Sequence, residues 1–252
     1  IFKETSKKYD RGKEHYSQSY GIIGETVNGV QSEYFSCLPE NLCIMPKHFN
    51  FHEAASMPLV FMTAYEMLIA RANLNKDDIV LVYGATSGVG SAAIQIAKDI
   101  GCEVFTTVGD KKKMDFAYSL GAKFVFNHRS ASFYQDVLKE LNGHKIDVVF
   151  EHIGKATWDS SLKLMSRGGR LVTCGATTGN IVNINLTHLF FKNQTILGST
   201  MGSLKTFQLV MEKISDKKYT PIIDEIVDIK DIKYAHDKIE KGLNLGKVIL
   251  DI

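Results

Sequence analysis

The sequence predicts an α/β protein built on a doubly wound parallel sheet. Short, β-branched, strand-like runs alternate with helical runs from residue 78 onward. The strand-like runs are apolar throughout, as expected when helices cover both faces of a parallel sheet. A glycine-rich turn joins the first of these strands to the first helix. We place this α/β domain at residues 58–202.

The elements of this domain follow from the alternation of the two patterns. Strands are predicted at 79–83, 103–108, 123–126, 147–153, 170–175 and 195–200. Helices are predicted between them at 88–100, 112–121, 131–141 and 157–166. The order βαβα is typical of a parallel sheet with crossover helices.

The flanking segments have a different character. A turn at Asn28–Gly29 and a strand-like run at 34–37 indicate antiparallel strands and turns over residues 28–46. Residues 51–71 are expected to be helical on both sides of Pro58, which suits the first turn of a helix. A helix at 203–216, another near 230–242 and a last strand at 246–252 are also expected. The polar, weakly periodic start without Met predicts a chain that begins inside a domain.

Composition excludes several classes of function. A net charge of +2 with interspersed signs does not favour a nucleic-acid surface. No apolar run approaches the roughly 20 residues of a membrane helix, and no signal peptide is evident. The four cysteines, at 37, 43, 102 and 174, form no C-x-x-C pair and no disulfide framework. We therefore expect a cytoplasmic protein that acts on a small molecule, without a nucleic-acid or membrane partner.

The turn "GATSGVG" is the strongest chemical motif. Gly84 permits the sharp turn after the strand, Gly88 lets the backbone approach a pyrophosphate, and Gly90 lets the helix lie close to the sheet. The free N–H groups of the helix start then face the phosphates. The alternative is a tight turn in an α/β protein that binds no nucleotide. The strand before, the helix after and the βα series behind it favour dinucleotide binding.

The tip of the next strand indicates which dinucleotide is bound. NAD-binding domains place an acid about 20 residues after the glycines, where it accepts a hydrogen bond from the ribose 2′-hydroxyl. Here Val108 stands at that point, followed by Gly109 and Asp110. Lys112 and Lys113 then supply cations for a 2′-phosphate. The sequence therefore favours NADP(H) over NAD(H), although most lysine runs are simply solvated.

A second glycine-turn family must be weighed. Residues 84–90 also satisfy the Gly-x-x-x-Gly-x-Gly turn of short-chain dehydrogenases, and Tyr234 and Lys238 have the spacing of their catalytic Tyr-x-x-x-Lys pair. The expected serine before the tyrosine is missing, however, and 83 residues precede the turn. Tyr234 also lies in an ordinary amphipathic helix pattern, where such i, i+4 pairs are common.

A longer series of motifs resembles the medium-chain dehydrogenase/reductase superfamily, in its zinc-type alcohol dehydrogenase and quinone oxidoreductase-like members. The matching blocks, in order, are "GIIGETVNGVQSEYFSCLPENLCIMP", "AASMPLVFMTAYEML", "VLVYGATSGVGSAAIQIAK", "GGRLVTCGATTG", "ILGSTMG" and "GKVILDI". The resemblance implies a Rossmann dinucleotide-binding domain inserted into a GroES-like β catalytic domain. Residues 1–57 and 203–252 would belong to the catalytic domain, whose first portion is expected to be absent.

The resemblance also implies a set of cofactor-binding positions. Thr63 would approach the nicotinamide and its ribose, and Val89 would press toward the nicotinamide ring. Backbone near the ends of two later strands would hold the carboxamide, and a basic residue near the last strand would contact the phosphates. These further positions are Cys174, Gly175, Ala176, Ser199, Met201 and Lys247.

The zinc sites of the superfamily do not match. Its structural zinc takes four cysteines, and the corresponding positions here are Lys3, Ser6, Tyr9 and Ser17, none of which replaces a thiolate. A catalytic cysteine of the alcohol dehydrogenase branch is replaced by Leu59. We therefore expect no zinc.

Other potential ligands have simpler explanations. Cys37 and Cys43 are expected to be small core residues, and His48 and His52 a surface pair near a helix start. His152 ends a strand at the cofactor side, where it either polarises a substrate carbonyl or, as we favour, caps the strand end.

The function that these observations favour is a zinc-independent, NAD(P)H-dependent oxidoreductase that transfers hydride to or from an activated C=C or C=O. No catalytic residue is identified. One alternative is a zinc-type alcohol dehydrogenase with ligands in a missing N-terminal portion. Another is a non-catalytic dinucleotide-binding protein or a truncated product. The apolar strand 195–200 is expected at a sheet edge, which favours a homodimer or homotetramer.

Overall fold

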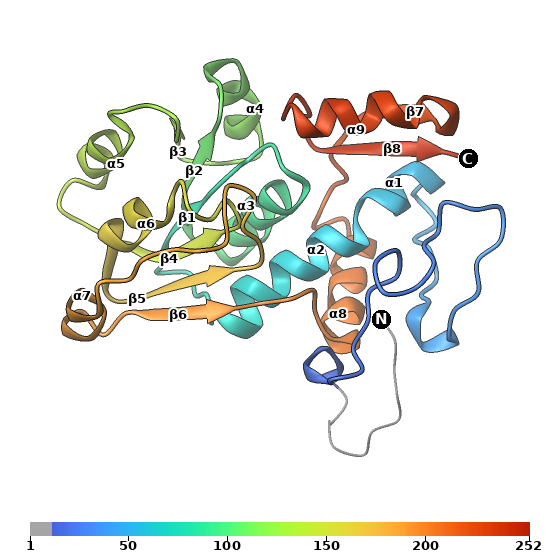
Figure 1. Ribbon diagram of the computed structural model, residues 1–252, viewed down its shortest axis with the longest axis horizontal. Helices are drawn as coiled ribbons and strands as arrows, with labels where there is room; N and C mark the ends of the chain where they lie inside the picture. The colour runs from blue at the N-terminus through green and yellow to red at the C-terminus, as the bar shows by residue number, and fades with distance from the viewer. Residues whose placement is uncertain (1–11) are drawn as a thin grey trace. The chain divides into compact units, whose positions relative to one another are not determined.

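The computed structural model describes residues 12–252 (Figure 1). Lys3, Ser6 and Tyr9 lie outside the described residues. The chain divides into two compact units. One consists of residues 63–199, and the other combines the chain up to residue 62 with residues 200–252. The expected domain boundaries at 57 and 202 stay predictions, and the two units are treated separately below.

The unit 63–199 is built on a six-stranded, wholly parallel sheet (Figure 1). Its strand order is β3-β2-β1-β4-β5-β6, which is the order of a Rossmann fold. The strands are β1 (Ile79–Val82), β2 (Glu103–Val108), β3 (Phe124–Asn127), β4 (Ile146–Glu151), β5 (Met165–Thr173) and β6 (Thr195–Gly198). The predicted α/β class, the parallel sheet and each of its six strands are confirmed.

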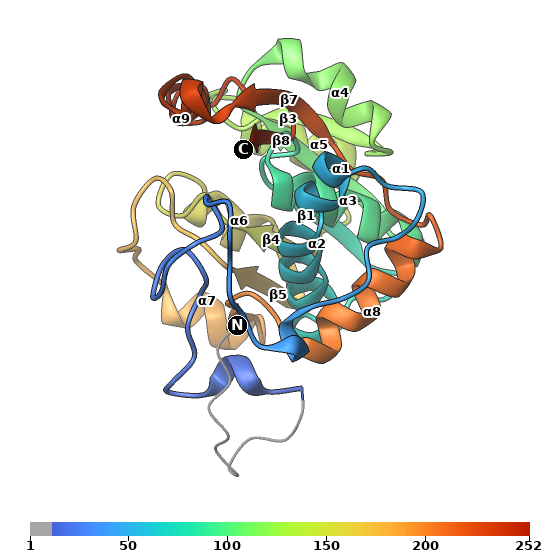
Figure 2. The same cartoon turned by 90° about the vertical axis from the view of Figure 1, so that its right-hand side faces the viewer.

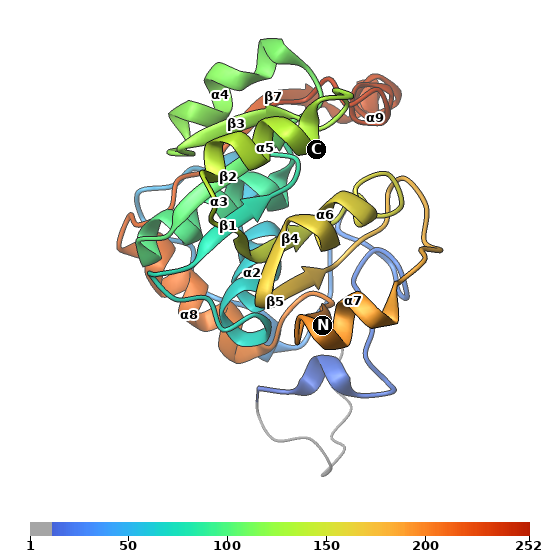
Figure 3. The same cartoon turned by 90° about the vertical axis from the view of Figure 1, so that its left-hand side faces the viewer.

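Helices cover the central part of this sheet. Its helical segments are the end of α2 (Pro58–Tyr65), η3 (Glu66–Arg71), α3 (Gly88–Ile100), η4 (Lys111–Lys113), α4 (Met114–Ser119), α5 (Phe133–Leu141), α6 (Trp158–Leu164) and α7 (Leu186–Phe191). α5 and α6 lie on one face of the sheet and α3 on the other (Figure 3). The core beneath α5 and α6 buries Tyr83, Phe105 and Leu171 among other apolar side chains. Burial on both faces explains why these strands are apolar throughout.

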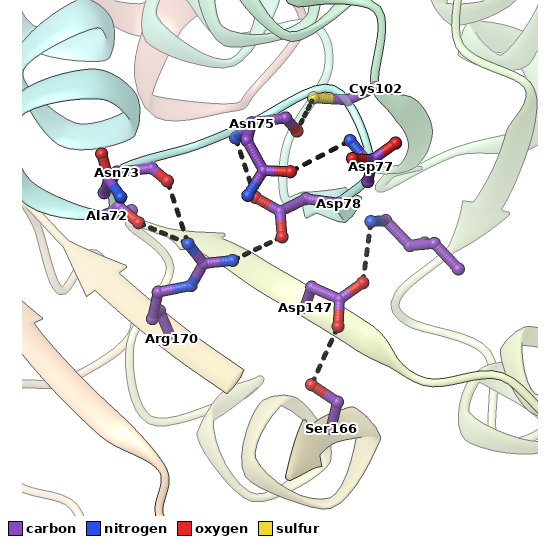
Figure 4. A network of polar contacts seen from close by, with 10 residues as sticks. Ala72, Asn73, Asn75, Asp77, Asp78, Cys102, Asp147, Ser166 and Arg170 are labelled. Atoms are coloured by element: carbon purple, nitrogen blue, oxygen red, sulfur yellow. Dashed lines mark hydrogen bonds and ion pairs between the residues drawn. The ribbon is translucent and has the colours of Figure 1, made fainter. Parts of the chain in front are cut away.

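A polar network closes the amino end of the sheet (Figure 4). The Arg170 guanidinium on β5 donates to the carbonyls of Ala72 and Asn73 at 2.8 and 3.0 Å and pairs with Asp78 at 2.5 Å. The other Asp78 oxygen accepts the N–H of Asn75 at 2.9 Å. Since a charge removed from water must be paired and hydrogen-bonded, this network fixes the turn that leads into β1.

A second carboxylate at the same end joins β4 to its neighbours. Asp147 accepts the N–H of Ile79 and the hydroxyl of Ser166, each at 3.0 Å (Figure 4). The amino ends of β1, β4 and β5 are therefore held by side chains, which leaves the opposite, carboxyl edge for ligands.

The second unit contains a smaller sheet. In it β7 (Ile223–Asp228) and β8 (Lys247–Asp251) pair in parallel, and α9 (Ile232–Glu240) packs on this pair (Figure 2). The other helices of the unit are α1 (Phe51–Ser56), the start of α2, α8 (Leu204–Ser215) and the short η1 (Glu14–Tyr16), η2 (Pro39–Asn41) and η5 (Ile229–Asp231). The predicted helices around Pro58, which begins α2, and the last strand are confirmed.

Three expectations for local structure are wrong or incomplete. Residues 34–37 form no strand, and the only pairing described near them is an isolated bridge between Ile23 and Val27. Neither nearby cysteine is a core residue, because Cys43 is exposed and Cys37 is half-buried. β7 and α7 were not predicted at all. The apolar side chains of residues 27–44 are largely exposed, so burial gives this segment no strand register.

Candidate functional site

The predicted cofactor residues of the unit 63–199 gather at the carboxyl edge of its sheet. The glycine turn follows β1, the lysines follow β2, and the segments at 174–176 and 199 follow β5 and β6. Strand order reverses between β1 and β4, and open α/β sheets bind their ligands in the crevice at such a point. The structure therefore brings together residues that are more than 100 positions apart in the chain.

The glycine turn has the geometry of a close backbone approach. Gly84 has φ +68°, a conformation that side chains disfavour. A Cβ on Gly90 would lie 2.2 Å from the Gly84 carbonyl oxygen, so only glycine fits there. Ser87 caps α3 by accepting the Gly90 N–H at 2.9 Å. The turn thus leads into the start of a 13-residue helix, and helix starts of this kind bind phosphate groups in proteins.

Strand β2 holds one side of this turn. The Ala85 N–H donates to the Thr107 carbonyl at 2.8 Å, and the Gly84 N–H donates to the Thr107 hydroxyl at 3.1 Å. The same hydroxyl lies 3.0 Å from Nδ1 of His128, which follows β3. Burial lowers the pKa of His128 from 6.5 to about 4, with the neighbouring Arg129 cation contributing in the same direction. His128 is therefore a neutral polar support at pH 7.

His152 holds the other side of the turn. Its Nε2 lies 2.9 Å from the Tyr83 carbonyl oxygen and 3.4 Å from the Ser87 hydroxyl. A Cβ on Gly84 would lie 3.0 Å from the same nitrogen. Burial lowers the pKa of His152, so the ring is neutral at pH 7. This geometry supports a strand-end cap, as favoured from the sequence, because the ring nitrogen is occupied by the end of β1.

A buried carboxylate shapes the segment that carries His152. Glu151 is fully buried at the end of β4 and accepts four hydrogen bonds. The donors are the N–H groups of Ile153 and Gly154, at 2.6 and 3.1 Å, and the hydroxyls of Thr157 and Ser161, at 2.9 and 3.1 Å. A carboxylate that is so well supplied with donors can remain in the interior. It fixes the link between β4 and α6.

Cations gather beyond the tip of β2. Lys112 is exposed and Lys113 half-buried in the turn η4, and the Asp110 carboxylate caps this turn by accepting the Lys112 N–H at 3.0 Å. Arg129, which follows β3, brings a further cation: its guanidinium carbon would lie 3.3 Å from a Cβ on Gly109. The carboxylate of Asp110 is therefore engaged at the start of its own turn, and three basic residues, Lys112, Lys113 and Arg129, follow the ends of β2 and β3.

The other end of the site is formed by β5 and β6. Cys174 donates its N–H to the Glu151 carbonyl at 3.3 Å, and Ser199 donates its N–H to the Thr173 carbonyl at 2.9 Å. The Gly175 carbonyl accepts the Thr173 hydroxyl at 3.1 Å. Ala176, the next position, is exposed. Burial raises the pKa of the Cys174 thiol to about 11, so it is no thiolate nucleophile at pH 7.

Three further residues that the family resemblance assigns to the cofactor are Thr63, Met201 and Lys247. Thr63 is buried in the unit 63–199. Met201 and Lys247 belong to the other unit, in which Met201 has φ +52° and Lys247 begins β8. Burial lowers the pKa of Lys247. Their assignment to a cofactor stays a prediction.

The Tyr234–Lys238 pair is part of a polar network with two half-buried acids of β7. The Tyr234 hydroxyl donates to Glu225 at 3.1 Å, and Lys238 pairs with Glu225 at 2.6 Å and Asp224 at 2.7 Å. The hydrogen bond to Glu225 raises the pKa of Tyr234, whereas catalysis by such a tyrosine needs a lower one. The pair therefore lacks the electrostatics of the short-chain dehydrogenase design.

Potential metal ligands do not gather into a cluster in the part of the chain that the structure describes. Residues 12–252 contain no group of three or more His, Cys, Asp or Glu side chains that could hold a metal ion. Leu59 is half exposed on α2, and His52 pairs with Asp251 at 3.0 Å. These side chains do not fit a zinc ion, whereas the glycine turn fits a pyrophosphate.

Sequence reasoning missed four residues that shape the site: Thr107, His128, Arg129 and Glu151. Each lies at or just beyond the carboxyl end of a strand. The rule that ligands collect at this edge could have identified Arg129, which comes two residues after β3. The partners of the others depend on which strands are neighbours, and strand order was not predicted.

The fold and the glycine turn define the class, which is a protein with a Rossmann dinucleotide-binding domain. Residues 88–216 match the zinc-binding dehydrogenase family. The chain also superposes on a solved NAD-dependent alcohol dehydrogenase with a TM-score of 0.90 and 32% identity, covering 95% of this chain and 70% of that one. The chain therefore belongs to the zinc-binding dehydrogenase family of the medium-chain dehydrogenase/reductase superfamily.

Similar proteins include both reductases and alcohol dehydrogenases. The chain is 29% identical to the crotonyl-CoA carboxylase/reductase of Cereibacter sphaeroides, over 92% of this chain and 60% of that protein. It is 28% identical to the quinone oxidoreductase of Homo sapiens, over 91% of this chain and 71% of that protein. A 2-octenoyl-CoA carboxylase/reductase solved with NADP and 2-octenoyl-CoA is 28% identical, with a TM-score of 0.78 and coverages of 84% and 52%. The chain thus spans about half to three quarters of these relatives' lengths.

Proposed function

We propose that this chain belongs to an NADP(H)-dependent oxidoreductase that transfers hydride between the nicotinamide and an activated C=C or C=O. The observation that carries the proposal is the glycine turn at the start of α3. The 2.2 Å separation between a Cβ on Gly90 and the Gly84 carbonyl oxygen means that α3 can begin this close to the end of β1 only with glycine at position 90. Free N–H groups at the helix start then bind the pyrophosphate.

The preference for NADP(H) over NAD(H) rests on charge at the tip of β2. Lys112, Lys113 and Arg129 follow the ends of β2 and β3 and would supply cations for the 2′-phosphate, and Asp110 caps its own turn. Charge-assisted hydrogen bonds from such side chains would favour the phosphorylated ribose. One solved relative is bound to NADP, in line with this proposal, whereas another is described as NAD-dependent.

The nicotinamide half would lie over the ends of β5 and β6. Thr63 and Val89 would contact the ring, and the backbone of 174–176 with Ser199 and Met201 would hold the carboxamide. Lys247 would contact the phosphates. A bound nicotinamide supplies the hydride, and the chain orients it and excludes water. His152 and Cys174 supply no free acid or base at pH 7, because the first is a neutral cap and the second a protonated thiol.

Zinc independence is part of the proposal. The described side chains offer no three-ligand group, and Leu59 stands where a ligand is needed. The relatives named quinone oxidoreductase and crotonyl-CoA carboxylase/reductase support an enoyl or quinone substrate. The alcohol dehydrogenase neighbour favours the second candidate, a zinc-type alcohol dehydrogenase whose ligands lie elsewhere.

We further propose a homodimer or homotetramer, and a small-molecule substrate. β6 ends the sheet, and Leu186, Phe190 and Phe191 beside it on α7 are all more than 60% exposed. An apolar edge of this kind needs a cover. No helix among residues 12–252 is long and apolar enough to cross a membrane.

Turnover and metal content test the proposal together. The protein is incubated with NADPH and either a quinone or a crotonyl thioester, and NADPH oxidation is followed with and without a chelator. We expect oxidation that resists the chelator and that the Gly90→Ala variant lacks. A stoichiometric zinc ion with chelator-sensitive alcohol oxidation would establish the second candidate instead. Cofactor binding without turnover of any of these substrates would favour the non-catalytic binding protein.

A further inference from the structure

Two histidines support the glycine turn. His128 acts through the Thr107 hydroxyl, whereas His152 contacts Ser87, the residue that caps α3. Its Nε2 is 2.9 Å from the Tyr83 carbonyl oxygen and 3.4 Å from the Ser87 hydroxyl oxygen. A carbonyl oxygen only accepts hydrogen bonds, so Nε2 must carry a hydrogen. Because burial keeps the ring neutral, this is its single N–H, and it points between Tyr83 and Ser87.

The hydroxyl of Ser87 therefore receives two donors. The Gly90 N–H approaches its oxygen at 2.9 Å as the cap of α3, and the His152 N–H approaches at 3.4 Å. A hydroxyl oxygen has two acceptor positions, and both are now taken. Its own hydrogen must point away from both donors. No acceptor among residues 12–252 is recorded for that hydrogen, and Ser87 is half-buried at the start of the helix.

We propose that His152 is a positioning residue that orients the Ser87 hydroxyl, so that Ser87 donates its hydrogen to a pyrophosphate oxygen of the bound dinucleotide. The inference rests on the proposed function and assigns a new donor within that site. Glycine at the position of Ser87 would leave the phosphate only backbone N–H groups. Ser87 adds a charge-assisted O–H donor, and the N–H of His152 keeps that hydrogen away from the side of Oγ that His152 contacts.

Affinity for three ligands tests the inference by calorimetric titration of the full chain. NADPH and ADP-ribose both contain the pyrophosphate, whereas 2′,5′-ADP contains the 2′-phosphate without it. We expect Ser87→Ala to raise the Kd for NADPH and for ADP-ribose by about 10-fold or more. That change corresponds to the loss of one hydrogen bond to a charged group. Binding of 2′,5′-ADP should change less than about twofold. In turnover, the KM for NADPH should rise while kcat holds.

A double-mutant cycle tests the part assigned to His152. His152→Leu should raise the Kd for NADPH by about 3- to 10-fold when Ser87 is present. In the Ser87→Ala background the same change should raise it by less than about twofold, because the hydroxyl that His152 orients is already gone. His152→Gln places an N–H donor near the position of Nε2 and should restore affinity to within about twofold. If His152→Leu fails to fold, the affinities of His152→Gln and Ser87→Ala still test the part assigned to His152.

A matched control separates capping from ligand binding. Ser203 caps α8 in the same way, accepting the Thr206 N–H at 3.0 Å. Ser203→Ala should lower the melting temperature and leave all three affinities unchanged. Additive effects of Ser87 and His152, or equal losses for 2′,5′-ADP and ADP-ribose, would overturn the inference. If the wild-type protein binds NADPH and Ser87→Ala binds it equally well, the inference is overturned but the proposed function stands. If the wild-type protein binds no dinucleotide, both are overturned.

Discussion

Removal of the Asp78 carboxylate should destabilise the unit 63–199 by about 3 kcal/mol. Only 9% of the Asp78 side chain and 21% of the Arg170 side chain are exposed. Breaking a buried pair costs about 3–5 kcal/mol, because an uncompensated charge remains. Arg170 keeps two carbonyl partners at 2.8 and 3.0 Å, which places Asp78→Ala at the lower end. The value of about 3 kcal/mol includes the cost of leaving the Asn75 N–H without its acceptor.

Urea unfolding and thermal unfolding measure this effect. At about 2–4 °C per kcal/mol for a chain of this size, the melting temperature should fall by about 6–12 °C. Asp77→Ala is the matched control, since that side chain is exposed next to Asp78 and should change stability by less than about 0.5 kcal/mol. Replacing both Asp78 and Arg170 by apolar residues should cost less than the sum of the single changes. A loss below about 1 kcal/mol for Asp78→Ala would refute the reasoning.

Three further predictions concern the site. Gly90→Ala should abolish dinucleotide binding in a titration because its Cβ meets the Gly84 carbonyl oxygen at 2.2 Å, whereas Gly198→Ala, which has open space, should bind normally. Burial lowers the pKa of His128 to about 4, so the unfolded chain binds more protons between about pH 4 and 6.5; stability should be full above this range and fall as the pH drops through it. His128→Gln should flatten part of that slope in urea unfolding, and an unchanged slope would contradict the assignment. Tyr234→Phe should keep turnover within about twofold, since its hydroxyl is engaged by Glu225; a loss above about 100-fold would revive the short-chain mechanism.

The sequence was most informative where local pattern and burial agree. The three glycines located the turn because its backbone leaves no room for a side chain at some positions. A Cβ on Gly90, for example, would lie 2.2 Å from the Gly84 carbonyl oxygen. Strand 103–108 was predicted to the residue, because both of its faces are buried. Residues 34–37 begin with two aromatic residues, a type that also favours strands, yet they form no strand. Strand formation depends on a partner strand and on burial, which local composition does not reveal.

The parts of the site that escaped prediction depend on neighbours distant in the chain. Glu151 is recognisable as a buried acid only once Thr157 and Ser161 are seen to supply donors. Arg129 reaches Gly109 because β3 pairs with β2, a relation that propensity does not give. β7 was missed because its sequence, IDEIVD, carries three acids and resembles a loop. The positions taken from the family resemblance remain predictions until a cofactor is bound.

Calorimetric titration of the whole chain with NADPH and with NADH tests the central proposal most directly. One saturable site per chain is predicted, with NADPH bound at least about tenfold more tightly than NADH. That ratio corresponds to a single charge-assisted contact from Lys112, Lys113 or Arg129 to the 2′-phosphate. Absence of saturable binding would contradict dinucleotide binding at the glycine turn, and tighter binding of NADH would contradict the role assigned to these three cations.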